Sequence, residues 1–101
     1  MILILTTFQK KSEAVKIGKD LLKKRVIACY NLIPVESVYW WKGKIEEAKE
    51  FMMILKAQKE DYRKIESIII QSSSYETPEV ISVKPDKVNK SYLDWISAET
   101  K

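Results

Sequence analysis

The 101-residue sequence contains no histidine, and this absence excludes several kinds of site. Without an imidazole, the chain has no Ser-His-Asp or Cys-His machinery, no imidazole general base and no histidine zinc site. Cysteine occurs once, at Cys29, so no disulfide can form within the chain and the fold does not depend on an oxidising compartment. We therefore expect a protein that is not an enzyme and that folds without a cofactor.

Long apolar segments are missing too. The apolar start, residues 1–5, is too short for the core of a signal peptide and has no basic region before it. No segment approaches the roughly 20 apolar residues that a membrane-spanning helix requires. We expect a cytoplasmic protein with no membrane partner.

Arginine, glutamine and asparagine are scarce. Nearly all the positive charge comes from lysine, with Arg25 and Arg63 as the only arginines, and the two amides together occupy five positions. An excess of Lys and Glu over thermolabile amides is typical of proteins from hot-growing organisms, so we expect a thermostable protein. The net charge of +4 comes from interspersed charges of both signs, which gives only a mild attraction for anions.

The sequence does contain a regular succession of strand-like and helix-like segments. Strands are predicted at residues 2–5, 26–41, 45–57 and 80–83, and helices at 12–25, 60–71 and after Asn89. The order strand, helix, strand, strand, helix, strand is that of the split βαβ arrangement. The predicted fold class is α+β: a ferredoxin-like βαββαβ sandwich with an additional C-terminal helix, formed by a single domain over residues 1–101.

Four residues set local expectations. Ser12 is a candidate N-cap for the first helix, and Gly18 in its apolar stripe should let the helix lie close on the sheet. Pro34 should interrupt and bend the second strand, at an edge or a bulge, because proline cannot donate to a sheet. Gly43 should take the left-handed conformation of a tight hairpin.

The strands carry more apolar surface than helices on one face can cover. Side chains alternate between the faces of a strand, so Trp40 and Trp41 should point to opposite sides, and residues 51–55 place large apolar groups on both faces. Each such side chain gains roughly 1.5–3 kcal/mol from full burial, so an uncovered set would favour aggregation. We expect identical subunits to cover the second face in a closed homo-oligomer.

Several sequence blocks resemble those of one known family, in order and along the whole chain. These blocks are Ala28–Pro34 (ACYNLIP), Ser37–Ile45 (SVYWWKGKI), Met53–Lys56 (MILK), Tyr75–Glu79 (YETPE) and Tyr92–Trp95 (YLDW). Together they are similar to the CutA divalent-ion-tolerance proteins. The resemblance implies a homotrimer in which the long second and third strands cross subunit boundaries. It also implies a link to tolerance of copper and other divalent metals, and a trimer architecture similar to that of PII signalling proteins.

The chain departs from the family pattern at one informative place. The family usually has His-Pro directly before the tyrosine of the YETPE block, and this sequence has Ser73 and Ser74 there. That histidine has been suggested as a metal ligand near the subunit cleft. Its replacement counts against a copper site of that design.

Two residues are the metal candidates. Cys29 would supply a thiolate suited to copper(I), and Glu79 a carboxylate, with Met52 or Met53 as further donors. One thiolate alone is not a site, so such a site would need three subunits or these additional donors. The alternative is that Cys29 is a small buried hydrophobe in a strand. Copper or another divalent cation is thus the candidate ligand.

A second set of residues is expected at the cleft between subunits. It comprises Trp40, Trp41, Lys56, Tyr75, Glu76, Tyr92 and Trp95. The aromatic members either line a ligand cleft or serve only in core and interface packing. Lys56 either contacts an anion or extends its ammonium from a strand end to solvent, and Glu76 either binds a cation or solvates its loop.

Three rival functions remain for comparison. An RNA-recognition domain would need aromatic residues on its first strand, and the predicted first strand, residues 2–5, has none. An acylphosphatase would need an arginine-containing loop after that strand, and residues 6–10 (TTFQK) contain no arginine. We therefore expect no nucleic-acid partner. The serious alternative is a PII-like trimeric sensor, in which a small anion or nucleotide binds between subunits and alters contact with an unidentified protein partner.

Overall fold

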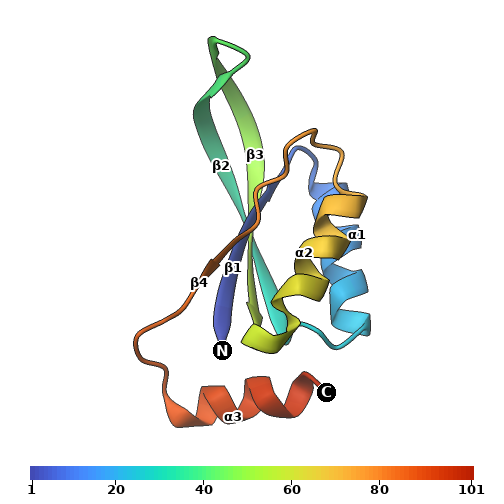
Figure 1. Ribbon diagram of the computed structural model, residues 1–101, viewed down its shortest axis with the longest axis vertical. Coiled ribbons are helices and arrows are strands. Elements are labelled where there is room, and N and C mark those ends of the chain that lie inside the picture. Colours follow the sequence, from blue (N-terminus) through green and yellow to red (C-terminus); the bar gives the residue numbers. More distant parts are fainter.

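The computed structural model describes all residues from Met1 to Lys101 and contains four strands and three α-helices (Figure 1). In chain order the elements are β1 (Ile2–Phe8), α1 (Lys11–Lys23), β2 (Cys29–Trp41), β3 (Lys44–Ala57), the short 3₁₀ helix η1 (Lys59–Asp61), α2 (Tyr62–Ser72), β4 (Ile81–Val83) and α3 (Lys90–Glu99). The expected order of strands and helices is confirmed, including the additional C-terminal helix.

The four strands form one antiparallel sheet in the order β2-β3-β1-β4. Figure 1 shows α1 and α2 together on one side of this sheet, while α3 crosses the end where the N-terminus lies. This is the split βαβ topology predicted from the sequence. None of the helices is both long and apolar enough to cross a membrane.

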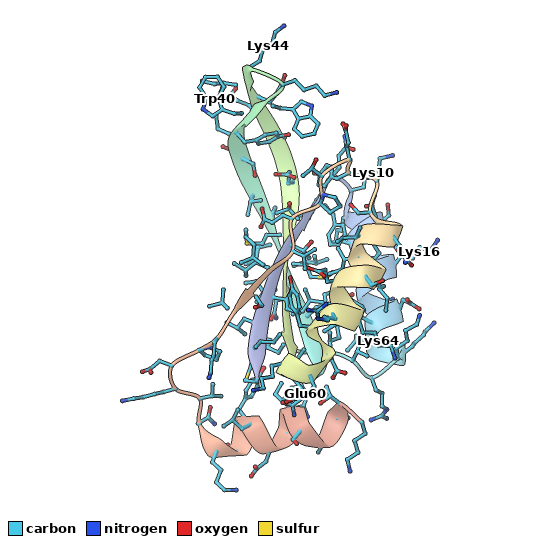
Figure 2. All side chains as sticks on the ribbon, viewed as in Figure 1. Lys10, Lys16, Trp40, Lys44, Glu60 and Lys64 are labelled. Atoms are coloured by element: carbon cyan, nitrogen blue, oxygen red, sulfur yellow. The ribbon has the colours of Figure 1, made fainter.

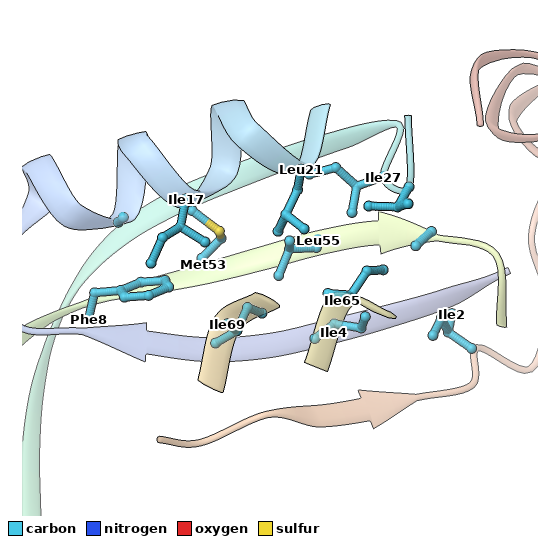
Figure 3. Close-up of a cluster of buried hydrophobic side chains, with 13 residues drawn as sticks. Ile2, Ile4, Phe8, Ile17, Leu21, Ile27, Met53, Leu55, Ile65 and Ile69 are labelled. Carbon is cyan, nitrogen blue, oxygen red and sulfur yellow. The ribbon is translucent and has the colours of Figure 1, made fainter. Parts of the chain in front are cut away.

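The core lies between the sheet and the two helices on its covered face. β1 and β3 alternate, so that Ile4, Phe8, Met53 and Leu55 point toward the helices and are fully buried. They meet an apolar stripe on each helix, as Figure 3 shows for Ile17, Leu21, Ile65 and Ile69. Side chains on the opposite face of the same strands lack such a cover.

The start of α1 differs from the prediction. The N-cap residue is Lys10 rather than Ser12, in an extended conformation with no side-chain capping bond. Ser12 lies exposed within the first turn. Glu13 in the same turn instead binds the loop after α2, accepting hydrogen bonds from the Ser74 backbone N–H (2.9 Å) and hydroxyl (2.8 Å). The first turn of α1 therefore has no side-chain cap, and its Glu13 side chain instead contacts a distant loop.

The prediction for the second strand was wrong in two respects. β2 begins at Cys29, because Val26 and Ile27 leave the strand path to fill the core at the end of α1, where both are buried. Pro34 neither interrupts nor bulges the strand, since the pairing with β3 runs without a break from Cys29↔Lys56 to Trp41↔Lys44. Pro34 is tolerated because β2 is an edge strand, as expected, and an edge needs hydrogen bonds on one side only.

Beyond the covered part of the sheet, β2 and β3 continue as a two-stranded arm (Figure 1). Its tip is the two-residue turn Lys42-Gly43, in which both residues have positive φ, 49° and 81°. This pattern matches the tight hairpin turns whose twist suits a β-ribbon. The left-handed conformation expected at Gly43 is confirmed.

Large apolar side chains are exposed on the arm and on the helix-free face. Trp40 is 72% exposed and Ile45 61%, and Figure 2 shows Trp40 at the tip of the arm, far from the helices. On the helix-free face Ile33, Ile81 and Val83 are between 40% and 49% exposed. The excess of apolar strand surface inferred from the sequence is therefore confirmed, and α3 does not cover it.

Gly18 permits a close approach, as predicted. A Cβ at this position would lie 2.7 Å from the ring of Tyr30 on β2, which is closer than carbon atoms approach one another. The tyrosine ring thus packs directly on the backbone of α1 and fastens the helix to the edge strand.

We predict that Gly18→Ala lowers the free energy of unfolding by up to about 2 kcal/mol. Overpacking costs about 1–3 kcal/mol, and the better helix propensity of alanine returns at most about 1 kcal/mol. Guanidinium unfolding measures the change, with Lys16→Ala on the exposed side of α1 as the control. In the Tyr30→Leu background the same substitution should be neutral or stabilising, and an equal loss in both backgrounds would contradict the packing explanation.

Candidate functional site

A cleft of about 620 Å³ lies on the helix-free face, between the arm and the loop that follows α2. This loop runs from the end of α2 across the strands to β4 (Figure 1). The cleft is lined by Thr7, Ser37, Val38, Tyr39, Trp41, Glu50, Met52, Tyr75, Glu76, Thr77 and Glu79. Apart from Val38, the strand residues in this set share one face, as the pairing register requires.

Glu50 is the most buried acidic residue of the cleft, with an exposed fraction of only 8%. Its carboxylate accepts a hydrogen bond from the Tyr75 hydroxyl. Burial raises the pKa of Tyr75 well above its ordinary value, and the bond to Glu50 and its negative charge raise it further, so this hydroxyl remains a donor at any physiological pH. The bond ties the loop after α2 to the middle of β3.

Ser73 and Ser74 hold this loop in place. The Ser73 hydroxyl accepts a hydrogen bond from the Tyr75 backbone N–H (3.1 Å), and Ser74 is the residue that binds Glu13 of α1. Ser73 and Ser74 thus position the cleft wall through hydrogen bonds within the chain.

The cleft is acidic and its inner carboxylates have no cationic partner. Burial raises the pKa of Glu79, and the nearby charge of Glu50 raises it further. At the rim, Glu76 is exposed and pairs with Lys42 (3.7 Å). None of the chain's ion pairs includes Glu50 or Glu79.

Cys29 occupies a different place, at the end of the sheet where α3 crosses. Its sulfur lies 3.7 Å from the Tyr92 hydroxyl, and burial together with Cys29 raises the pKa of Tyr92. Lys56 pairs with Cys29 across the strands and donates to the Asn31 side chain. The ring of Trp95 lies 5.5 Å from that of Tyr92.

The metal candidates Cys29 and Glu79 are therefore not brought together within one chain. The nearest paired cleft residue, Met52, lies opposite Ile33, four strand positions after Cys29, or about 14 Å at 3.4 Å per residue. No group of three cysteine or acidic side chains comes close enough to hold a metal ion. One chain supplies only the inner carboxylates of the cleft, and a divalent ion would need further oxygen ligands from another subunit or from water.

The predicted cleft residues also separate into three places. Trp41, Tyr75 and Glu76 meet in the cleft, where the metal candidate Glu79 also lies. Trp40 points to the other face of the arm, as its alternation with Trp41 predicted. Lys56, Tyr92 and Trp95 lie at the Cys29 end of the sheet.

Sequence reasoning missed the most buried acidic residue of the cleft, Glu50. A signal for it was present, because Glu50 stands just before the apolar run 51–55 and alternation places it on the same face as Met52 and Ile54. Tyr39 was also missed, although a similar signal was present: it stands two positions before Trp41 on β2 and therefore shares the face of Trp41.

The comparison with known proteins decides the family. The family model for the CutA1 divalent ion tolerance protein matches residues 2–99. The chain belongs to the CutA1 divalent ion tolerance family. The divalent-cation tolerance protein CutA of Pyrococcus horikoshii is 43% identical over 101 residues, which cover 100% of this chain and 99% of the relative.

Solved CutA structures have the same fold. The crystal structure of CutA1 from Pyrococcus horikoshii superimposes with a TM-score of 0.95 at 42% identity, covering 100% of this chain and 99% of the other. The CutA protein of Archaeoglobus fulgidus, described as a periplasmic divalent cation tolerance protein, has a TM-score of 0.96 at 36% identity and full coverage of both chains. These CutA names refer to cation tolerance and to no enzymatic reaction. The cytoplasmic location of this CutA chain stays a prediction.

We predict that Glu79→Gln stabilises the protein near neutral pH and that this gain disappears in acid. The pKa of Glu79 in the folded state lies above its ordinary value of 4.5, so the folded state binds this proton more tightly than the unfolded state. The contribution of Glu79 to stability is therefore present below that ordinary value and is lost as the pH rises through the raised pKa. Guanidinium unfolding between about pH 4 and about pH 8 measures the effect.

The matched control is Glu47→Gln, which changes an exposed glutamate on the arm outside the cleft. Its difference from the wild type should not follow the same pH profile. A Glu79→Gln variant that is less stable than the wild type at neutral pH would contradict the assignment.

Proposed function

We propose that this CutA chain acts as a homotrimer in divalent-cation tolerance, with copper as the candidate ion, and that it binds the cation without catalysing a reaction. The observation that carries the proposal is the pair of inner carboxylates, Glu50 and Glu79, in a cleft where no lysine or arginine neutralises them. The family name supports the relevance of divalent cations.

Self-association is supported by the uncovered face of the sheet. Ile33, Ile81 and Val83 form an exposed apolar surface there, and the arm carries further exposed aromatic side chains. β2 is also a long free edge whose unpaired backbone groups can bind a neighbouring strand. A closed ring of three copies would bury both features and leave no free edge to aggregate.

The cleft suits a cation by its chemistry. Carboxylate oxygens are ligands for hard divalent ions, whereas the Cys29 thiolate suits copper(I). Because Cys29 and Glu79 lie far apart in one chain, a site that uses both would have to draw them from different subunits. A site built on Glu50 and Glu79 alone needs only water or one further donor from a neighbour.

The PII-like alternative has weaker support. An anion in the cleft would meet the carboxylates of Glu50, Glu76 and Glu79, and like charges at short range are repulsive. Lys56, the residue expected to contact an anion, lies at the other end of the sheet. The remaining support for this alternative is the similarity in architecture that the family implies.

We predict that the protein sediments as a trimer at micromolar concentration and that Ile81→Asp shifts it toward the monomer. A buried charge in the proposed interface would be unpaired and costly. Ile70→Asp is the matched control, because Ile70 on α2 is 50% exposed and Ile81 is 49% exposed, yet only Ile81 lies on the helix-free face. A well-folded wild-type monomer in analytical ultracentrifugation would refute the proposed assembly.

We predict that the trimer binds Cu²⁺ or Zn²⁺ and that Glu50→Gln or Glu79→Gln weakens this binding at least about tenfold. The loss of one charge-assisted contact costs about 1.5–3 kcal/mol. Calorimetry on the wild type, both variants, Cys29→Ala and the control Glu47→Gln measures the effect. If only Cys29→Ala abolishes binding, the cation site lies at the other end of the sheet and the cleft assignment is wrong.

A further inference from the structure

The first three residues after α2 are held to the rest of the domain by hydrogen bonds. The Ser73 backbone N–H donates to the Ile69 carbonyl (2.9 Å), and the Ser73 hydroxyl accepts from the Tyr75 backbone N–H (3.1 Å). Between them, Ser74 donates its backbone N–H (2.9 Å) and its hydroxyl (2.8 Å) to the two carboxylate oxygens of Glu13. The backbone that leads into Tyr75 is therefore fixed by α1 and α2 together.

Glu13 makes this contact from the start of α1, on the helix side of the sheet. Its carboxylate takes part in none of the chain's ion pairs, and both of its oxygens are used by a residue 61 positions later in the sequence. Figure 1 shows the loop after α2 passing the start of α1 before it crosses to β4. Because the acceptor is charged, these bonds are stronger than bonds between neutral groups.

Tyr75 extends this fixed backbone into the cleft. Its hydroxyl donates a hydrogen bond to Oε2 of Glu50. Oε1 of the same carboxylate accepts no hydrogen bond from the chain and is not fully enclosed, so it is the oxygen available to a cation. A hydrogen bond to one oxygen of a ligating carboxylate orients the other, and loss of such a bond costs roughly 10–100-fold in metal affinity.

We propose that Glu13, which lies outside the cleft, is a positioning residue for the cation site. Through Ser74 and Tyr75 it sets the orientation of the Glu50 carboxylate and hence the affinity for a divalent cation. This inference rests on the proposed function, which places the cation at Glu50, and adds control of that site from α1. Coverage of the helix-free face by neighbouring subunits leaves such a site usable, because an ion needs room only for itself and its oxygen ligands.

Calorimetry of the full-length protein in its native oligomeric state, with Zn²⁺ as the probe, tests this series of contacts. Glu13→Ala should weaken Zn²⁺ binding about fivefold, because the loop loses the bonds that place Tyr75. Tyr75→Phe should weaken it about tenfold. The double variant should bind no more weakly than Tyr75→Phe alone, since Glu13 acts only through the Tyr75 hydroxyl. Additive losses in the double variant would overturn the proposal.

Glu13→Gln separates position from charge. The amide oxygen can still accept the Ser74 backbone N–H and the amide nitrogen can donate to the Ser74 hydroxyl, while the negative charge is removed. Glu13→Gln should therefore bind Zn²⁺ within about twofold of the wild type. An equal loss in Glu13→Gln and Glu13→Ala would assign Glu13 a purely electrostatic attraction and overturn the positioning role. The matched control is Asp20→Ala, which removes another half-buried acidic residue of α1.

Tyrosine titration gives a readout that needs no metal. The pKa of Tyr75 is raised by burial first, then by its bond to Glu50 and the charge of Glu50, with smaller contributions from Tyr39 and Glu13. A loosened loop exposes the phenol, so Tyr75 should ionise at a lower pH in Glu13→Ala than in Glu13→Gln, although both lack the Glu13 charge. Near-ultraviolet absorbance, measured as the difference from the same protein carrying Tyr75→Phe, follows this ionisation. Identical titrations in the two variants would overturn the proposal.

The two proposals fail separately. Zn²⁺ binding that depends on Glu50 but is unchanged in Glu13→Ala leaves the cation-tolerance proposal standing and removes this inference. Absence of Zn²⁺ binding to the wild type removes the proposed function, and the positioning role falls with it. Guanidinium unfolding and sedimentation confirm that each variant folds and assembles as the wild type does.

Discussion

The unbroken pairing of β2 with β3 is the interaction on which the rest of the structure depends. Thirteen residue pairs run from Cys29↔Lys56 to Trp41↔Lys44 without a bulge, so every side chain on the two strands has an assigned face. A slip of one residue would move Glu50 and Met52 to the helix side and Met53 and Leu55 into the cleft. The same pairing carries the arm beyond the helices and keeps its aromatic residues away from the core.

A second constraint ties this arm to the body of the domain. The start of the loop after α2 is held by two adjacent residues: Ser74 binds Glu13 of α1, and Tyr75 donates a hydrogen bond to Glu50 of β3. Together these contacts form one wall of the cleft from segments that lie far apart in the sequence. They also show why Ser73 and Ser74 are compatible with the CutA fold: both hydroxyls form hydrogen bonds in this wall.

Much of the fold followed from local patterns, and the errors have physical reasons. Strand order, helix stripes, the turn at Gly43 and the close approach at Gly18 rest on alternation, periodicity and backbone freedom, which short stretches of sequence express. Ser12 and Pro34 were misjudged because a tertiary contact replaced the cap, and because an edge position removed the penalty on proline. The contact of Glu13 with Ser74 is not visible within a few residues of Ser12, and the edge was expected for Pro34, but the unbroken pairing depends on the partner strand β3.

The candidate site was predictable only in part. The sequence by itself determined the α+β topology, the family, the excess of apolar strand surface and the presence of aromatic and acidic residues near the end of the arm. Only the tertiary structure decided that Trp41, Tyr75 and Glu79 meet around Glu50, while Cys29, Lys56 and Tyr92 gather at the opposite end of the sheet. The reason is that composition and alternation assign a residue to a face, whereas its position along the face depends on strand register and on where a distant loop crosses the sheet.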